Sequence, residues 1–144
     1  MTILAEIGPI EFEIPFTVQP KQADRSTKSG IHYQPKEVTE NANNLAALVA
    51  PYRPAKPLDG PIIATFTFKF PWIGKHKKIR QTHTWWPKDT IPDLDNLEKQ
   101  LCDVFQRSGF FKNDSRIFRK VTEKRYEDQG GINVRLEVWS ETND

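Results

Sequence analysis

The sequence is poor in sulfur and has no long apolar run. Cys102 is the only cysteine among 144 residues. A single cysteine excludes an internal disulfide and any zinc site built from several cysteines. No apolar segment approaches the roughly 20 residues that a membrane-spanning helix needs. Residues 1–10 include Glu6 and lack the basic start and apolar stretch of a signal peptide. These absences predict a cytoplasmic protein in a reducing compartment.

Histidines are also few and scattered. His32, His76 and His83 show no His-x-x-x-His or similar spacing for zinc. A hydrophobic content of 37% with 28% charged residues is typical of a folded globular chain. A chain of 144 residues suffices for one core but not for two. We therefore expect a single domain over residues 1–144.

Basic residues are unevenly distributed along a chain whose formal net charge is only +2. No acid lies between Lys69 and Lys88, and a second basic stretch runs from Lys112 to Arg125. Such stretches indicate a surface that meets a polyanion, although an ordinary solvated face is the alternative. The candidate DNA contacts are Lys75, Lys77, Lys78, Arg80, Lys88, Arg116, Arg119, Lys120 and Lys124.

Four stretches carry the signal of β-strands. Apolar and polar residues alternate over 10–18, 65–70 and 132–138, which is typical of half-buried strands. The stretch 116–126 is rich in β-formers but alternates imperfectly, which predicts a bend or bulge. Residues 127–131 contain Gly130 and Gly131 and predict a hairpin between the last two strands.

Two stretches have helical spacing. The first covers 38–49 and must end before Pro51. The second begins at Pro92-Asp93, contains Leu97, Leu101, Val104 and Phe105 on one face, and ends at Arg107-Ser108-Gly109.

The resulting order, β-α-β-α-β-β, predicts an α+β domain with one mixed or antiparallel four-stranded sheet packed on two helices. Two connections, 19–35 and 71–92, are unusually long. Loops of more than about 12–15 residues often have a function, and the second one leads directly into Asp93.

Asp93 and Asp95 flank the expected start of the second helix. Two aspartates separated by one residue point the same way where the chain is extended. Acids at this position also stabilise a helix through its dipole by about 0.3–1 kcal/mol. A pair of Asp95 with Lys99 would add a few tenths of a kcal/mol. These two residues alone therefore leave helix capping and metal chemistry both open.

A third acid favours chemistry. Asp114 follows the turn at Gly109, and we expect the returning chain to bring it near Asp93. Three carboxylates from two segments would suit Mg²⁺, which prefers oxygen ligands and leaves further positions to water and phosphate. A turn residue remains the alternative for Asp114, since Asn-Asp pairs favour turns.

The segment from Asp93 to Lys99 (Asp-Leu-Asp-Asn-Leu-Glu-Lys), followed by Asp103, Gly109-Phe110 and the run from Asn113 to Ile117, resembles the signature of RusA-type Holliday-junction resolvases. These are small homodimeric endonucleases of bacteria and their phages, which act in DNA recombination and repair. The resemblance is strong over 92–137 and weak for the first strand and the first helix. It departs from the family pattern at Asn113, where many members have a second acid, and in the longer loop 71–92.

The resemblance implies a structure-selective endodeoxyribonuclease that cuts four-way junctions by paired nicks. It implies that Asp93, Asp95 and Asp114 bind Mg²⁺, with Mn²⁺ as a substitute, and that Lys99 is the catalytic lysine. It also implies a homodimer acting on branched DNA. Asp103, four residues beyond Lys99, is expected to orient that lysine rather than to bind metal.

Four aromatic residues are candidates for stacking on bases or for a wedge at the junction, with core or dimer packing as the alternative. They are Trp85, Trp86, Phe110 and Phe111.

Two rival functions account for part of this pattern. A junction-binding or architectural protein whose acids only cap a helix explains the basic stretches but gives no reason for Asp114 to return towards Asp93. Nucleotide-sugar glycosyltransferases also use Asp-x-Asp with a divalent ion. They need a doubly wound domain, for which this chain has no room.

Overall fold

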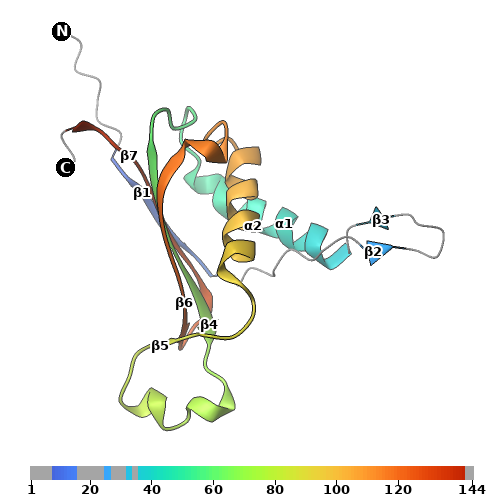
Figure 1. The fold of residues 1–144 in the computed structure, drawn as a ribbon, viewed down its shortest axis with the longest axis vertical. Helices are drawn as coiled ribbons and strands as arrows, with labels where there is room; N and C mark the ends of the chain where they lie inside the picture. Colours follow the sequence, from blue (N-terminus) through green and yellow to red (C-terminus); the bar gives the residue numbers. More distant parts are fainter. Residues whose placement is uncertain (1–7, 16–24, 27–31, 34–35, 142–144) are drawn as a thin grey trace.

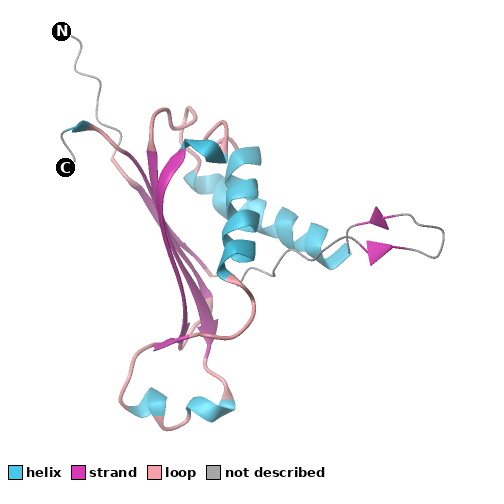
Figure 2. Ribbon diagram, in the orientation of Figure 1, coloured by secondary structure: helices cyan, strands magenta, loops and turns pink. Residues whose placement is uncertain are grey.

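A computed structural model describes residues 8–15, 25–26, 32–33 and 36–141. Its main feature is a five-stranded sheet in the order β1-β7-β4-β6-β5, with both helices on one face (Figures 1 and 2). The main-sheet strands are β1 (Ile10–Ile14), β4 (Ile62–Pro71), β5 (Trp86–Pro87), β6 (Ile117–Glu127) and β7 (Gly131–Val138). The helices are α1 (Lys36–Val49) and α2 (Leu94–Arg107), and a separate two-stranded ladder joins β2 (Arg25–Ser26) to β3 (His32–Tyr33).

The α+β class, the mixed sheet and both helices are confirmed, but the number of strands was predicted wrongly. The main sheet has five strands where four were expected, because β5 adds Trp86 and Pro87 beside Tyr126 and Arg125 of β6. A two-residue strand has no period-two pattern that a sequence could reveal. The first strand was expected to reach residue 18, and residues 16–18 lie outside the described part of the chain.

The expected hairpin between the last two strands is not formed, because β4 lies between them. β4 pairs in parallel with β6 and antiparallel with β7. β4 has the most continuous buried face of the sheet, because Ala64, Phe66 and Phe68 are all buried. Its central position gives it a neighbouring strand on each side, β7 on one and β6 on the other. The connection 128–130 therefore crosses the end of β4. It ends at Gly131, where an added Cβ would lie 2.7 Å from the carbonyl oxygen of Ile14.

The irregularity expected in the 116–126 strand is confirmed at the start of β6. The register passes from Ile62 opposite Ile117 to Ile63 opposite Arg119, so Phe118 is the extra residue. Such a bulge bends the strand and redirects the side chains that follow. The bend lies at the end of β6 that approaches α2.

α2 begins and ends where the sequence predicted. Asp93 occupies the N-cap position, and Ser108 follows the last helical residue. Gly109 has φ +83°, and the Phe110 amide donates to the Phe105 carbonyl at 2.9 Å. A residue with positive φ after a helix is usually glycine. Within the described residues, no helix has the length and apolar character needed to cross a membrane.

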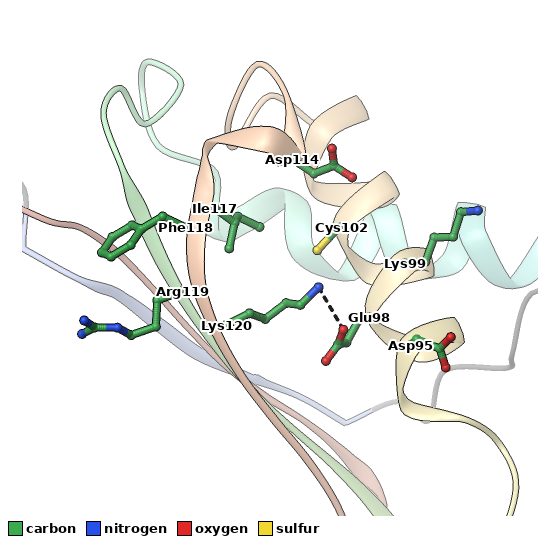
Figure 3. Close-up of a pocket in the computed structure, with 9 residues that line it drawn as sticks. All are labelled: Asp95, Glu98, Lys99, Cys102, Asp114, Ile117, Phe118, Arg119 and Lys120. Atoms are coloured by element: carbon green, nitrogen blue, oxygen red, sulfur yellow. Dashed lines mark ion pairs between the residues drawn. The ribbon is translucent and has the colours of Figure 1, made fainter.

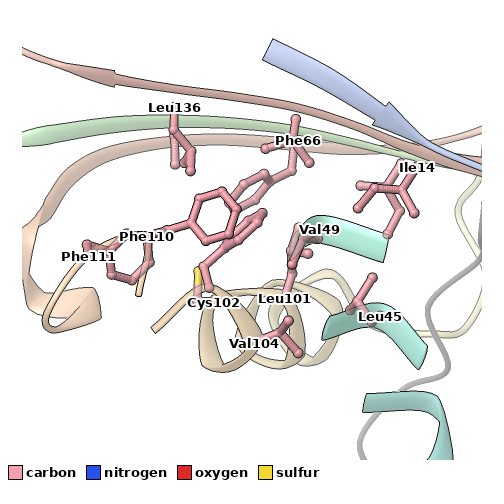
Figure 4. Packing of buried hydrophobic residues seen from close by; sticks show 14 of the residues in the cluster. Ile14, Leu45, Val49, Phe66, Leu101, Cys102, Val104, Phe110, Phe111 and Leu136 are labelled. Carbon is pink, nitrogen blue, oxygen red and sulfur yellow. The ribbon is translucent and has the colours of Figure 1, made fainter. Parts of the chain in front are cut away.

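The core lies between the helices and the sheet (Figure 4). Phe105 of α2 contacts Phe66 of β4 at a ring-centroid distance of 6.1 Å and Phe110 at 4.7 Å. Phe110 and Phe111 are fully buried. Of the two roles left open for them, core packing therefore holds and base stacking does not, because the Gly109 turn directs both rings inward to close the end of the core.

The long connection from β4 to β5 folds onto the end of the sheet. It contains two short 3-10 helices, Gly74–His76 and Ile79–Gln81. His76 is 2% exposed and packs on Tyr126 of β6 at a ring-centroid distance of 4.2 Å. Trp72 packs edge-on against His76 and donates its indole hydrogen to Asp128 at 2.8 Å. These contacts fix the base of the loop.

Acidification should weaken this anchor. Burial lowers the pKa of His76 below 6.5, and Lys75 and Lys88 lower it further. Because the unfolded chain then binds the proton more readily, His76 stabilises the fold fully above pH 6.5, and this contribution is lost as the pH falls through its folded pKa. Between about pH 7.5 and pH 5, we expect the melting temperature of the wild type to fall more than that of His76→Phe. Equal pH dependence would contradict this assignment.

Candidate active site

A pocket of about 370 Å³ lies between α2 and the start of β6 (Figure 3). It is lined by residues from α2, from the 3-10 turn Asp114–Arg116 and from β6. The lining residues are Asp95, Glu98, Lys99, Cys102, Asp114, Ile117, Phe118, Arg119 and Lys120. Three of the four residues predicted as catalytic, Asp95, Lys99 and Asp114, are thus on one surface.

The two acids of the pocket come from different segments. Asp95 lies in the first turn of α2, and Asp114 begins the 3-10 turn that precedes β6. In Figure 3 they stand at opposite ends of the pocket, with Cys102 between them. Both side chains are exposed. The turn is held by the Asp114 amide, which donates to Oε1 of Gln106 at 3.1 Å.

Asn113 has a structural role at this turn. It is the N-cap residue of the 3-10 turn, and its Oδ1 accepts a hydrogen bond from the Ser115 amide at 2.8 Å. The amide oxygen of Asn113 is sufficient for this contact, which an aspartate could make equally well. Asp114 is left as the carboxylate of the turn.

Asp93 is not among the residues that line the pocket. It is exposed at the N-cap of α2, in extended conformation, and its side chain makes no capping hydrogen bond. Asp93 therefore occupies the capping position of the helix, but its side chain does not make the capping hydrogen bond. Asp93 and Asp114 flank opposite ends of a 14-residue helix, which rises about 21 Å. This length works against the expected approach of Asp114 to Asp93.

No ready-made cluster of three metal-binding side chains exists among the described residues. Two aspartates nevertheless offer hard oxygen donors at the pocket. Mg²⁺ is commonly held by one or two carboxylates, with water and substrate phosphates completing its six positions. An ion held by Asp95 and Asp114, or by all three aspartates, stays a prediction.

An ion pair that was not predicted from the sequence crosses the pocket. Nζ of Lys120 on β6 lies 2.9 Å from Oε2 of Glu98 on α2 (Figure 3). The hydrogen bond to Glu98 raises the pKa of Lys120, so its ammonium stays charged at neutral pH. Helical spacing could have placed Glu98 at the pocket, because Glu98 follows Asp95 by three residues and lies on the same face of the helix.

Cys102 lines the same pocket, but its thiol has low reactivity. Burial raises the pKa of its thiol to about 12. Since the thiolate is the reactive form, Cys102 stays a neutral wall of the pocket at neutral pH.

We expect the Glu98–Lys120 pair to contribute modestly to stability. The Lys120 side chain is 38% exposed, and exposed pairs contribute about 0.2–1 kcal/mol. Glu98→Gln and Lys120→Met should each lower the free energy of unfolding by up to about 1 kcal/mol. The double variant should lose less than the sum of the two, as measured by urea titration. Strict additivity would contradict direct coupling.

The predicted DNA contacts fall into three groups. Lys75, Lys77, Lys78 and Arg80 are exposed on the loop between β4 and β5. Lys88 and Lys124 instead make contacts within the protein. Nζ of Lys88 donates to the Tyr126 hydroxyl at 3.0 Å, and Nζ of Lys124 donates to the Pro92 carbonyl at 2.8 Å. These two lysines fix the segment that carries Asp93.

The other three predicted contacts lie near the pocket. Arg116 pairs with Asp59 at 3.1 Å, and the Arg119 guanidinium stands over the Phe118 ring at 5.3 Å. Lys120 is held by Glu98 inside the pocket. Two of these three cations are thus paired with acids of the protein, Asp59 and Glu98.

Comparison with known proteins places this geometry in context. The family model described as endodeoxyribonuclease RusA matches residues 14–137. The crossover junction endodeoxyribonuclease RusA of Lactococcus phage r1t is 24% identical over 121 residues, covering 83% of this chain and 88% of the phage protein. The match includes α2, the turn at Asp114 and the whole of β4 and β6.

Proposed function

The chain belongs to the RusA family of endodeoxyribonucleases, and we propose that it resolves four-way DNA junctions by metal-dependent hydrolysis at the pocket between α2 and β6. One observation carries the proposal. Asp95, Lys99 and Asp114, which the sequence motif singles out from two segments, line a single pocket. Phosphodiester hydrolysis needs both a way to activate water and positive charge beside the phosphate.

Asp95 and Asp114 are proposed to hold Mg²⁺, for which Mn²⁺ would substitute. When bound, such an ion lowers the pKa of water and offsets the negative charge of the phosphate. Asp93 is proposed as a further ligand on the segment that enters α2. Its exposed carboxylate, free of a capping hydrogen bond, supports that role.

The lysines of the pocket are proposed to contact the scissile phosphate. Lys99 lies one helical turn beyond Asp95 and is exposed. Its ammonium would stabilise the charge that develops on the phosphoryl oxygens in the transition state. Asp103 remains the proposed partner that orients Lys99 from the next turn. The basic residues of the β4–β5 loop would contact phosphates and position the duplex without reading its sequence.

Resolution requires two nicks related by symmetry, so we propose that the chain acts as a homodimer. A two-fold dimer supplies two equivalent pockets to opposed strands of the junction. Light scattering should then give twice the chain mass, 2 × 16.7 kDa. A monomer at the concentration where junctions are resolved would contradict the dimer.

The decisive experiment compares a labelled four-way junction with a linear duplex of the same arms. Incubation with Mg²⁺ should give paired symmetric nicks in the junction, and EDTA should abolish them. The duplex should stay uncut. Tight junction binding without any cut would overturn the nuclease and favour the architectural protein.

A further inference from the structure

A second pocket lies on the β4–β5 loop, outside the proposed active site. It has a volume of about 330 Å³. We call it the tryptophan pocket, and its lining residues are Thr82, His83, Thr84, Trp85, Trp86 and Pro87. Trp85 is 42% exposed and Trp86 is 36% exposed. Two adjacent, partly exposed indoles on a folded loop indicate a binding surface.

Trp85 is held in place from one side. The Arg125 guanidinium of β6 stands over its ring at 4.3 Å. Arg125 is itself fixed by ion pairs with Glu123 at 2.8 Å and Glu127 at 3.8 Å. Because the guanidinium covers one face of the indole, the exposed area belongs to the opposite face and the ring edge. Such a ring can stack on a flat group without having to be ordered first.

Trp86 is fixed in a different way. Its backbone pairs with Tyr126 at the edge of the sheet, and His83 stands edge-on to its ring at 5.1 Å. Nδ1 of His83 lies 2.9 Å from the Thr82 hydroxyl and 3.3 Å from the Ile79 carbonyl. Hydroxyl groups and an imidazole therefore surround the indoles. A ligand for this pocket has a flat apolar face and polar edges.

The charge around the pocket identifies the class of ligand. Lys75, Lys77, Lys78 and Arg80 are exposed on the same loop, and no acid occurs from residue 70 to residue 88. Exposed aromatics among cations are typical of surfaces that bind unpaired nucleic acid, where bases stack on the rings and lysines follow the phosphates. We propose that the tryptophan pocket takes an unstacked nucleobase of the DNA substrate.

The chain path limits how far that base lies from Asp93. Seven residues lead from Trp86 to Asp93, and an extended chain spans at most about 3.5 Å per residue. The pocket thus lies within about 25 Å of Asp93, or about seven nucleotides at 3.4 Å each. Lys124 fixes this segment through the Pro92 carbonyl. The inference rests on the proposed function in that its ligand is DNA, and it adds a base-binding subsite at the other end of β6 from the proposed active site.

The test measures binding without cleavage. In EDTA, a duplex carrying one unpaired 2-aminopurine is compared with the fully paired duplex. Binding is followed by anisotropy and base stacking by 2-aminopurine fluorescence. We expect Trp85→Leu and Trp86→Leu to weaken binding of the unpaired-base duplex by about 5- to 150-fold, the loss of one stacked base. Both should bind the paired duplex as the wild type does, and Trp85→Phe should restore most of the loss.

A matched control separates stacking from charge. Replacing Lys77 and Lys78 by Ala should weaken binding of both duplexes alike and reduce the salt dependence by up to about two counterions. Leu variants that bind both duplexes like the wild type, or that lose both equally, would overturn the inference. The inference would also be overturned if the Leu variants lost binding to anionic phospholipid vesicles but kept their binding to DNA. A wild type that cuts no junction, while its Leu variants still lose the unpaired base, would overturn the proposed function and leave this inference standing.

Discussion

Asp95→Asn should cut a four-way junction at least about 10³-fold more slowly than the wild type, and should bind it equally well or more tightly. The amide keeps the size of the carboxylate but loses the charge that would hold a divalent ion. An ion at the site contributes several kcal/mol of transition-state stabilisation, and 10³-fold corresponds to about 4 kcal/mol. Binding improves because one negative charge beside the phosphates is removed. Single-turnover cleavage and binding in EDTA measure the two effects separately.

Asp89→Asn is the matched control for this change. Asp89 is exposed, lies four residues before Asp93 and does not line the pocket. The same substitution there should leave the cleavage rate within about twofold of the wild type. Asp114→Asn should match Asp95→Asn, and either variant cutting at the wild-type rate would remove that residue from the proposed site. Asp93→Asn decides whether the carboxylate outside the pocket is a ligand once DNA is bound.

The sequence predicted well what local chemistry determines. α2 lies where Asp93 and Gly109 placed its ends, because capping geometry and positive φ are properties of a few neighbouring residues. The bulge at Phe118 was visible for a similar reason, since a skipped residue breaks the alternation of its own strand. Of the four residues predicted as catalytic, Asp95, Lys99 and Asp114 line one pocket and Asp93 does not, and the roles of all four stay predictions.

Long-range pairing was predicted less well. Adjacent strands usually pair, so a short connection after Glu127 indicated a hairpin. The insertion of β4 between β6 and β7 depends on which strand most needs burial on both sides, and this is decided by the whole sheet. Phe110 and Phe111 show the same limit, since paired aromatics look alike in sequence whether a turn directs them inward or outward.

The site itself was predicted only in part. In the sequence, Lys120 is one of several basic residues, and nothing in its neighbours indicates that it meets Glu98 across the pocket. That contact depends on the distance between α2 and β6, which the core sets. The pairing of charges in the pocket therefore depends on tertiary structure, while its acids can be recognised from a short stretch of sequence.

Phe105→Ala should lower the free energy of unfolding by about 3–5 kcal/mol, the range for deleting a fully buried phenylalanine. Phe105 is 0% exposed, and its ring is within 6.4 Å of the rings of Phe66, Phe110 and Phe111, measured between centroids. A helix, a strand and the Gly109 turn thus all meet at this side chain, and few neighbours can move to fill the cavity. Urea unfolding followed by circular dichroism measures the loss. Phe105→Leu, which keeps most of the volume, should lose clearly less.

The same substitution tests how firmly the core positions the chemistry. Phe105 lies on the buried face of α2, while Asp95 and Lys99 lie on the exposed face of the same helix. Cleavage depends on acids placed to within about 0.5 Å, whereas loop lysines contact phosphates with little geometric demand. Below its melting temperature, Phe105→Ala should therefore bind junctions nearly as the wild type does but cut them more slowly. Val121→Ala, at a side chain 55% exposed on β6, should change neither property. Equal losses of binding and cutting in Phe105→Ala would mean that the core supports the DNA surface as much as the pocket.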